Sequence, residues 1–530
     1  MGRIFAWRKG VYMLEIRNLK LTHIQDSRVI LEDFSMVLNP GDRAVIIGEE
    51  GNGKSTLLKW IFDPESVSDY MDVQGEMHTG KEVFGYLPQQ LPEEDKNRSV
   101  WEFFSDEERF PEQTPAELGR LAADFSLAPE FFFSDQKMET LSGGEKIKAQ
   151  LMRIMMRQPT VYLLDEPSND LDIETLQWLE DFICGCRETV LFISHDEVLI
   201  EHAANMIIHL EQIRRKMQSR HSVRHMTYGE YVRHRNAQMQ NQEDLAYQQR
   251  RRQKIREEKL RRIEQKVEHD QTTISRQDPH GGALLKKKMK AVKSMERRFE
   301  REKEDIAEKP ETETAILIRF DPERSYMPEG KTVLDLQKEK IMCPDGTRIL
   351  SENIALNVRG PEKICIIGKN GCGKSTLLKM IAEELTARKD LRAFYMPQNY
   401  DDLLYDQMTP PEYLSFSREK EEYTKIRTWL GSMKYTADEM NHRICDLSGG
   451  QKAKLFFLKM NLAGANVLIL DEPTRNFSPL SGPVIRTALK TFPGSIISVS
   501  HDRKYISEVC ERILRMDETG LHEISMGTIL

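Results

Sequence analysis

The chain has 530 residues, enough for about three domains of ordinary size, and its formal net charge is −8 at pH 7. Its seven cysteines have no regular spacing, which argues against a disulfide framework and favours a reducing compartment. No stretch approaches the roughly 18 apolar residues of a membrane-spanning helix, and no apolar signal core opens the chain, so we expect a cytoplasmic protein.

The beginning of the chain predicts strands. Residues 1–12 show no usable pattern, and both Met1 and Met13 are compatible with the natural start. Residues 14–47 then alternate apolar runs with turns, which is typical of β-strands. These strands lead directly into a glycine-rich segment.

That glycine-rich segment occurs twice. It is G-E-E-G-N-G-K-S-T at Gly48–Thr56 and G-K-N-G-C-G-K-S-T at Gly368–Thr376, 320 residues later. Each copy lies between an apolar run and a helical pattern, which is the context of a phosphate-binding loop. Backbone N–H groups would surround the phosphates of a nucleoside triphosphate, and Lys54 or Lys374 would reach their oxygens. An ordinary tight turn is the alternative, and the repetition argues against it.

Both loops also supply a hydroxyl for Mg²⁺, from Ser55 and from Ser375. The predicted nucleotide contacts in the two loops are Gly48, Gly51, Gly53, Lys54, Ser55 and Thr56, and Gly368, Gly371, Gly373, Lys374, Ser375 and Thr376.

An acidic pair also occurs twice. Asp165-Glu166 follows the apolar residues 161–164, and Asp471-Glu472 has the corresponding place in the second half. At the end of a buried strand, the aspartate of such a pair holds Mg²⁺ and the glutamate orients and deprotonates the attacking water. We therefore predict that Glu166 and Glu472 are catalytic bases.

Two further motifs keep the same distance from each acidic pair. A Leu-Ser-Gly-Gly sequence begins at Leu141 and at Leu447, in each case 24 residues before the aspartate. His195 and His501 each follow the glutamate by 29 residues. A lone histidine is more often structural than functional. The matching spacings nevertheless favour a catalytic role for both histidines.

The order of these motifs resembles the ATP-binding cassette family, in which they are called Walker A, Q-loop, signature, Walker B, D-loop and switch histidine. The resemblance covers both halves of the chain and implies two P-loop α/β domains that pair head to tail. Each ATP would lie between the Walker motifs of one cassette and the signature of the other. It also implies Q-loop glutamines at Gln89 and Gln398. The Mg²⁺ ligands expected in the two sites are Ser55, Gln89, Asp165, Ser375, Gln398 and Asp471.

Two composite ATP sites follow from this resemblance. Site 1 would combine Lys54, Ser55, Gln89, Asp165, Glu166 and His195 with Ser448, Gly449 and Gly450. Site 2 would combine Lys374, Ser375, Gln398, Asp471, Glu472 and His501 with Ser142, Gly143 and Gly144. The D-loops differ, because Ser168-Asn169-Asp170-Leu171-Asp172 follows the family pattern while residues 474–478, T-R-N-F-S, lack the aspartate. We expect unequal sites, and the preference for ATP over GTP is implied by the family alone.

The middle of the chain is strongly basic. Residues 211–310 contain 27 Lys and Arg against 16 Asp and Glu, a net +11, which leaves −19 for the rest of the chain. From Tyr228 to about Asp270 the sequence favours one helix of about 40 residues, roughly 60 Å long. A second helix follows, and residues 278–282 break the helical pattern between the two.

Apolar residues three or four apart predict that these helices form an antiparallel coiled coil. The expected seam contains Ile255, Leu260, Ile263 and Val267, and on the second helix Leu285, Met289, Val292, Met295 and Phe299. The domains predicted are a first cassette over 1–226, a helical-hairpin linker over 227–311 with its tip near 275–282, and a second cassette over 312–530.

The basic residues of the linker predict contact with a polyanion. Pairs such as Glu257/Arg261 would suit a solvated spacer, but they leave a large positive excess that phosphates could neutralise. The predicted nucleic-acid contacts are Arg250, Arg251, Arg252, Arg261, Arg262, Arg276, Lys286, Lys287 and Lys288. RNA is favoured over DNA.

Two cassettes joined by a basic helical hairpin resemble the ABC-F family of ribosome-associated ATPases. The resemblance implies ATP hydrolysis with Mg²⁺, and binding near the ribosomal E site by a monomer whose own cassettes pair. Its linker would reach P-site tRNA and the large-subunit rRNA of the peptidyl-transferase region. The distance from Gln89 to Leu141 is 52 residues and that from Gln398 to Leu447 is 49 residues, so neither interval contains a large insertion. This spacing, the short C-terminal end and the second D-loop resemble the antibiotic-resistance branch.

Other functions remain as alternatives. An ABC-F translation factor could act on stalled or idle ribosomes without protecting them from drugs. A transporter ATPase subunit would use the same cassettes, but it would need a membrane partner and has no use for a basic arm. A DNA-repair or chromosome-organising ATPase would need a longer coil or zinc-binding cysteine pairs.

Overall fold

The computed structural model describes residues 13–213, 218–273, 284, 286–295, 297, 320–343, 346, 348–404, 407–417 and 419–528. The chain forms two compact units. One contains Met1–Tyr228 together with Glu313–Leu530, and the other is Gly229–Thr312. The first unit holds both nucleotide-binding halves, here called cassette 1 and cassette 2.

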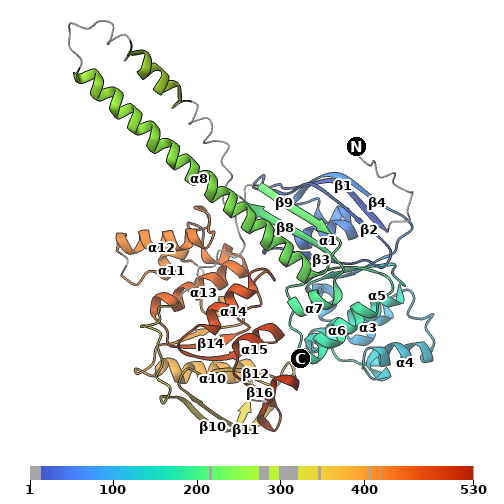
Figure 1. Cartoon of the computed structure of the whole chain (residues 1–530). Coiled ribbons are helices and arrows are strands. Elements are labelled where there is room, and N and C mark those ends of the chain that lie inside the picture. The colour runs from blue at the N-terminus through green and yellow to red at the C-terminus, as the bar shows by residue number, and fades with distance from the viewer. Residues whose placement is uncertain are drawn as a thin grey trace. The chain divides into compact units, whose positions relative to one another are not determined.

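Cassette 1 is built on two sheets (Figure 1). An antiparallel sheet has the order β2-β1-β4, and a six-stranded sheet has the order β5-β6-β7-β3-β8-β9, in which β9 alone runs antiparallel to its neighbour. The strands are β1 (Leu14–His23), β2 (Val29–Leu38), β3 (Arg43–Ile47), β4 (Met71–Thr79), β5 (Phe84–Leu87), β6 (Val161–Asp165), β7 (Thr189–Ile193), β8 (Met206–Ile213) and β9 (Gln218–Arg224). The central strands are continuous apolar runs because both faces of this sheet are covered, one of them by the antiparallel sheet and the helix Lys54–Phe62.

The helices of cassette 1 begin at residues that suit a helix N-terminus. Ser99, Thr114 and Ser142 each form a capping box with a glutamate three residues later. The α-helices are α1 (Lys54–Phe62), α2 (Glu93–Lys96), α3 (Val100–Ser105), α4 (Pro115–Asp124), α5 (Gly143–Met156), α6 (Ile173–Gly185) and α7 (Glu197–Ala203). Short 3-10 helices span Pro64–Val67, Pro129–Phe133 and Met138–Thr140.

Cassette 2 repeats this architecture. Its strands β10 (Thr332–Met342) and β11 (Ile349–Arg359) pair antiparallel, and its six-stranded sheet has the order β13-β14-β15-β12-β16-β17. That sheet contains β12 (Lys363–Ile367), β13 (Ala393–Met396), β14 (Val467–Asp471), β15 (Ser495–Val499), β16 (Arg512–Asp517) and β17 (Gly520–Ile524). Its helices are α10 (Lys374–Ala387), α11 (Pro410–Leu414), α12 (Lys420–Ser432), α13 (Gly449–Ala463), α14 (Gly482–Lys490) and α15 (Arg503–Val509), with 3-10 turns at Tyr400–Asp402, Ile444–Asp446 and Met526–Thr528.

The strand order explains why distant motifs meet. In cassette 1, β3 pairs in parallel with β7, and β7 pairs in parallel with β6. The phosphate loop follows β3, the acidic pair ends β6, and His195 follows β7. Since parallel strands end at the same sheet edge, all three motifs lie at that edge. In cassette 2, β12, β14 and β15 have the same arrangement.

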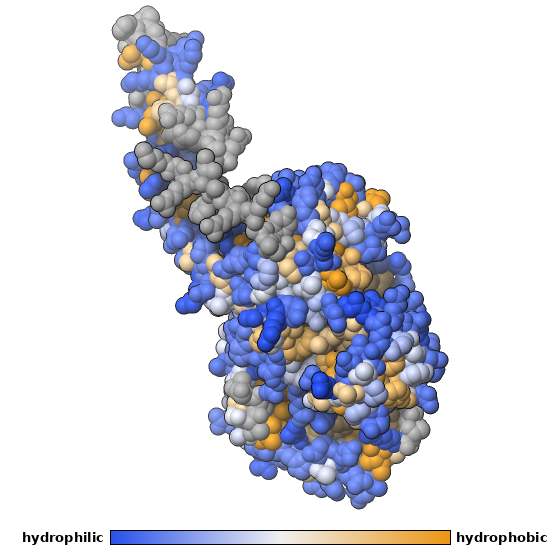
Figure 2. Space-filling model, turned by 90° about the vertical axis from the view of Figure 1, so that its right-hand side faces the viewer, coloured by the Kyte–Doolittle hydropathy of each residue, from blue (hydrophilic) through white to orange (hydrophobic). Residues whose placement is uncertain are grey.

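The linker unit contains one long helix, α8 (Tyr228–Thr273), and residues 286–295 are also helical. At 46 residues, α8 is about 69 Å long, somewhat longer than expected. Figure 2 shows a largely hydrophilic face on the described part of this unit. The predicted tip, with Arg276, and the seam residues Leu285 and Phe299 lie outside the described residues.

The seam is only partly buried. Val267 and Val292 are 6% and 2% exposed, whereas Ile255 and Ile263 are 47% and 46% exposed and Met295 is also exposed. Regular spacing therefore identified apolar positions on the helices, but burial is concentrated at the two valines.

Candidate nucleotide-binding sites

The two phosphate loops have the same backbone conformation. The three glycines of each loop have positive φ, at 146°, 79° and 82° in the first and 153°, 80° and 100° in the second. A Cβ atom on Gly48 would lie 2.2 Å from the carbonyl oxygen of Leu210, and one on Gly368 would lie 2.4 Å from that of Met516. Glycine is therefore required by both conformation and space.

The lysine of each loop is folded back over the loop. Lys54 Nζ donates to the carbonyl oxygens of Gly48 and Glu49 at 3.0 and 3.1 Å, and Lys374 Nζ donates to those of Gly368 and Lys369 at 2.8 and 2.9 Å. Both lysines are more than nine-tenths buried. Each ammonium group thus lies at the centre of the loop, where a bound phosphate would need a positive charge.

The oxygen groups predicted to hold Mg²⁺ lie together. The Ser55 hydroxyl donates to Asp165 Oδ1 at 2.9 Å, and Ser375 hydrogen-bonds Asp471 in the same way. Burial raises the pKa of Asp165 to about 6, against the opposing effect of the Ser55 hydrogen bond. A buried carboxylate beside a hydroxyl is a donor set that suits a hard cation such as Mg²⁺. The residues present therefore fit this metal.

The two Q-loop glutamines contact different partners. Gln89 Nε2 donates to Glu166 Oε2 at 2.9 Å, within cassette 1. Gln398 Nε2 donates instead to Oδ1 of Asp170, a residue of cassette 1, at 3.2 Å. The hydrogen bond of Gln89 therefore stays within its own cassette, whereas that of Gln398 crosses to the other.

Glu166 is held by several donors. Besides Gln89, Asn169 Nδ2 donates to its Oε2 at 2.5 Å, and His195 Nε2 lies 3.4 Å from its Oε1. Burial opposes ionisation of Glu166, but the His195 hydrogen bond and the charges of His195 and Lys54 outweigh it and lower its pKa to about 2. Glu166 is therefore ionised across the physiological range.

Glu472 has the opposite environment. It accepts weak hydrogen bonds at 3.4 Å from Ser500 Oγ and at 3.3 Å from the His501 backbone N–H, while its Oε1 has no hydrogen-bond partner among the described atoms. Burial and the neighbouring Asp471 charge raise its pKa to about 8. Burial and the charge of Lys374 lower the pKa of His501 to about 3. At neutral pH this pair is mostly uncharged.

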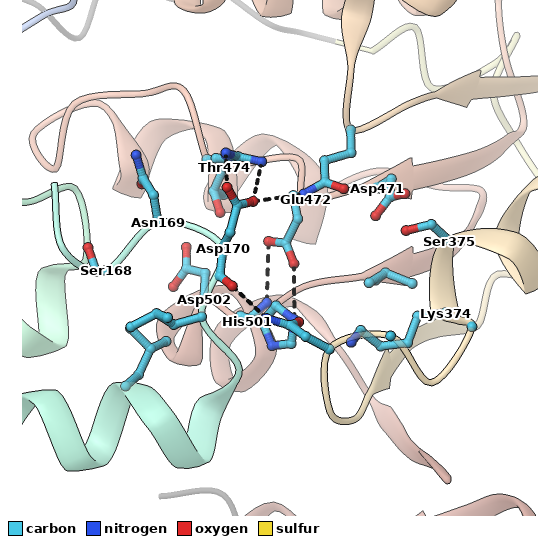
Figure 3. Close-up of a pocket in the computed structure, with 18 of the residues that line it drawn as sticks. Ser168, Asn169, Asp170, Lys374, Ser375, Asp471, Glu472, Thr474, His501 and Asp502 are labelled. Carbon is cyan, nitrogen blue, oxygen red and sulfur yellow. Dashed lines mark hydrogen bonds and ion pairs between the residues drawn. The ribbon is translucent and has the colours of Figure 1, made fainter. Parts of the chain in front are cut away.

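Figure 3 shows the surroundings of Glu472. Glu472 and His501 face each other, with an Oε1–Nε2 distance of 3.8 Å. Lys374 and Ser375 lie on one side of them, and Ser168–Asp170 of cassette 1 lie on the other. These residues line a cavity of about 490 Å³, which is large enough for a small-molecule ligand.

Both glutamates predicted to be catalytic have a left-handed backbone conformation. The φ angles of Glu166 and Glu472 are 49° and 51°. Such a conformation costs a non-glycine residue about 1–3 kcal/mol and is found mostly at functional sites. The shared conformation supports the prediction that these two residues have the same chemical role.

The signature sequences begin helices. Ser142 caps α5 and Ser448 caps α13, each in a capping box. A Cβ on Gly143 would lie 3.6 Å from Asn370 Nδ2, and one on Gly449 would lie 3.3 Å from Glu50 Oε2. Each signature thus lies next to the Walker A loop of the other cassette, as the head-to-tail hypothesis requires.

Asp170 is a site residue that sequence analysis named only as part of the D-loop. Its carboxylate forms an ion pair with Arg475 of cassette 2, with an Nη1–Oδ1 distance of 2.8 Å and an Nη2–Oδ2 distance of 3.0 Å. Its carbonyl oxygen also accepts a hydrogen bond from Asn370 Nδ2 at 2.5 Å. Across site 1, His195 Nδ1 lies 3.0 Å from the carbonyl oxygen of Phe477. The departure of the second D-loop, residues 474–478, from the family pattern was the feature of the sequence that could have indicated these contacts.

Ion pairs also join the two cassettes, and in each of the following pairs the acid belongs to cassette 1 and the base to cassette 2. The pairs are Glu197–Arg486, Glu180–Arg503, Glu201–Lys504 and Glu174–Arg515, with N–O distances of 2.6, 2.8, 2.6 and 2.6 Å. Glu197 and Arg486 are both buried. If cassette 1 of one chain paired with cassette 1 of a second chain, acids would face acids, and pairing of two copies of cassette 2 would bring bases together. The distribution of charge therefore favours pairing of cassette 1 with cassette 2 within one chain.

The linker side chains predicted to contact nucleic acid are exposed where the structure describes them. They are Arg250, Arg251, Arg252, Arg261, Arg262, Lys286, Lys287 and Lys288. In the described ranges, no helix has the length and apolar character that crossing a bilayer requires. Those same ranges contain no cluster of three or more His, Cys, Asp or Glu side chains that could hold a metal ion by itself.

Comparison with known families agrees with this geometry. A family model described as ABC transporter matches residues 31–169 and 351–475. The chain therefore contains two ABC transporter domains, one in each cassette. Such domains are ATPases, so the protein hydrolyses ATP to ADP and phosphate.

Curated relatives extend the comparison. The chain is 28% identical over 417 residues to ABC transporter F family member 5 of Arabidopsis thaliana, covering 77% of this chain and 56% of the relative. It is 26% identical over 556 residues to the energy-dependent translational throttle protein EttA of Escherichia coli (strain K12), covering 95% of this chain and 92% of that protein.

A solved structure supports the fold. The complex of the archaeal ribosomal stalk protein aP1 and the archaeal ribosome recycling factor aABCE1 contains a chain that superposes with a TM-score of 0.56. The identity is 17%, over 96% of this chain and 91% of that chain. At this identity the similarity shows the fold alone, which is a pair of cassettes.

Proposed function

Given two ABC transporter domains in one chain, we propose that this protein is a ribosome-binding ATPase of the ABC-F type. In the ATP-loaded form it binds near the E site and extends its linker toward P-site tRNA and the peptidyl-transferase rRNA. There it protects the cytoplasmic ribosome from antibiotics. The name of one relative, a translational throttle protein, supports the ribosomal part of this proposal, and the name of another, an F family member, supports the ABC-F part.

The observation that carries the proposal is the charge of the linker. Arg250–Arg252 and Lys286–Lys288 are exposed, and the surrounding window has a net charge of +11 while the rest of the chain is acidic. Exposed clusters of like charge repel one another, and phosphates supply the opposite charge. A transporter subunit would gain nothing from such an arm.

The cassettes supply the nucleotide chemistry. Lys54 and Lys374 bind the phosphates, while Ser55 with Asp165, and Ser375 with Asp471, would hold Mg²⁺. This ion neutralises the charge that develops on the phosphates. Glu166 and Glu472 accept the proton of the attacking water. Each signature closes on the γ-phosphate from the opposite cassette, so hydrolysis removes a contact that keeps the cassettes together.

The decisive experiment separates ATP binding from ATP hydrolysis. In the double variant E166Q/E472Q, both bases are lost but the phosphate loops are intact. We expect retained ATP binding, a loss of turnover of about 10²-fold or more, and accumulation on ribosomes in sedimentation assays. A double variant that still cycles off ribosomes would contradict the assignment of these glutamates. An ATP-bound variant with no affinity for ribosomes would contradict the proposed function.

A second experiment tests the linker. Neutralising Arg250–Arg252 and Lys286–Lys288 with glutamine should weaken ribosome binding and reduce its dependence on salt, since fewer counterions are released. The affinity of the free protein for ATP should not change. The matched control E257Q/E258Q removes acids from the same helix and should not weaken binding. Equal effects of both variants would argue against a specific role for the basic residues.

Drug protection is tested in cells. Expression of the protein should raise resistance to inhibitors of the peptidyl-transferase centre or the exit tunnel, and the E166Q/E472Q variant should not. Ribosome binding without any change in susceptibility would favour the alternative of a translation factor that acts on stalled or idle ribosomes. Association with membranes in place of ribosomes would favour a transporter subunit.

A further inference from the structure

The tips of the two Walker A loops have different charges. The residues after the first glycine are Glu49-Glu50 in cassette 1 and Lys369-Asn370 in cassette 2. The two tips therefore differ by three charges at pH 7, although the loops have the same backbone conformation. Both tips lie beside the signature helix of the opposite cassette.

In site 1 the acidic tip contacts the signature helix directly. The backbone N–H of Gly450 donates to Glu50 Oε2 at 2.7 Å. Lys454, one turn further along α13, forms an ion pair with Glu49 at 3.7 Å. Only about 30 Å³ of space is left between this tip and the start of α13.

In site 2 the corresponding tip makes other contacts. Asn370 donates its amide N–H to the carbonyl oxygen of Asp170, as described above, and Lys369 lies 3.5 Å from Glu174. Lys148, the counterpart of Lys454 on α5, lies over the ring of Trp178 in its own cassette, 5.0 Å from the ring centre. The tip of site 2 thus donates a hydrogen bond to the opposite cassette, whereas the tip of site 1 accepts one.

The Gly450 N–H is where a phosphate would be expected. It lies in the first turn of the 15-residue helix α13, and the free N–H groups of such a turn favour an anion. A carboxylate and a γ-phosphate oxygen satisfy the same donor in the same way. Glu50 is exposed, so its side chain can leave this position without disturbing a packed core.

We propose that Glu50 is a specificity-determining residue of site 1. Its carboxylate accepts the Gly450 N–H, and the γ-phosphate of ATP has to displace it before the signature can close. ADP has no γ-phosphate and does not compete for this donor. Glu50 therefore lowers the preference of site 1 for ATP over ADP, and site 2, with Asn370, lacks this restriction. The inference depends on the composite sites proposed above but not on ribosome binding.

The test measures nucleotide binding without ribosomes. In a K374A/E166Q background, which removes the site 2 lysine and prevents hydrolysis in site 1, the Kd values of radiolabelled Mg-ATP and Mg-ADP are measured by equilibrium dialysis. E50Q, which keeps the shape of the side chain, and E50N, which copies cassette 2, should tighten ATP binding about tenfold and ADP binding less than about twofold. The reciprocal variant N370E, in a K54A/E472Q background, should weaken ATP binding and leave ADP binding nearly unchanged.

Other outcomes would overturn the inference. If the variants bound ATP and ADP more tightly by the same factor, Glu50 would act only by repelling the negative charge of any bound phosphate. Unchanged binding of both nucleotides would mean that the contact with Gly450 has no role in nucleotide selection. If the K374A/E166Q parent bound neither nucleotide, the composite site 1 itself would be wrong, and the inference would fail with it.

Discussion

Sites 1 and 2 share the phosphate loop, the acidic pair and the histidine, and the spacing from acidic pair to histidine is the same, yet they have different electrostatics. In site 1, Glu166 has three side-chain partners and a pKa of about 2. In site 2, Glu472 is buried without comparable donors and has a pKa of about 8. The motif thus determines which group can act as the base, whereas the surrounding residues determine whether it is ionised.

The histidines of the two sites, His195 and His501, also differ in their hydrogen-bond partners. His195 lies between Glu166 and the Phe477 carbonyl oxygen, so both of its ring nitrogens have partners. His501 Nδ1 has no hydrogen-bond partner among the described atoms, and burial lowers the pKa of the ring. Site 1 therefore resembles an assembled catalytic centre, whereas in site 2 the base accepts only two weak hydrogen bonds. The aspartate of the first D-loop and the charge of the two loop tips add to this inequality.

The largest expected effect is on turnover at pH 7 in single glutamate variants. With a pKa of about 8, only about one-tenth of Glu472 is ionised at this pH, whereas Glu166 is fully ionised. E166Q should therefore reduce ATP turnover about tenfold, and E472Q less than twofold. Steady-state phosphate release measures both. Equal losses in the two variants would remove the proposed difference between the sites.

The next effect is on the pH dependence of the remaining activity. In E166Q only Glu472 can act, and it is a base only when deprotonated. Since its pKa is raised to about 8, turnover of E166Q should increase several-fold between pH 7 and pH 9. E472Q is the control, because Glu166 keeps its charge over this whole range and its activity should stay level. A flat profile for E166Q would show that Glu472 does not titrate as the structure indicates.

The smallest effect concerns the contact between Asp170 and Arg475. The Asp170 side chain is 55% exposed, so its ion pair is weakened by solvent and contributes about 0.2–1 kcal/mol. D170A in the E166Q background should reduce the remaining turnover about threefold. N476A, the equivalent change in the second D-loop, should leave this activity nearly unchanged, since Asn476 faces site 1. A larger loss in N476A would reverse the assignment of the two D-loops.

Much of the fold and of each site followed from local sequence. A phosphate loop needs its glycines within a few residues of the lysine and serine, and repetition of the whole pattern in Gly368–Thr376 made the assignment specific. The helical linker was also predictable, because residues 230–273 contain neither glycine nor proline. Its exposed basic clusters could be identified for the same reason. These features depend on neighbours in the sequence.

The unequal chemistry of the two sites could not be obtained in this way. The pKa of Glu472 depends on how completely the fold excludes water from it, and the Glu50–Gly450 contact joins residues 400 positions apart. The Asp170–Arg475 pair likewise exists only when one cassette faces the other. The sequence by itself determined which residues carry charge and which loops have the phosphate-binding pattern. Only the tertiary structure decided which charges meet and which are desolvated, because electrostatic energy depends on distance and solvent exposure and not on order along the chain.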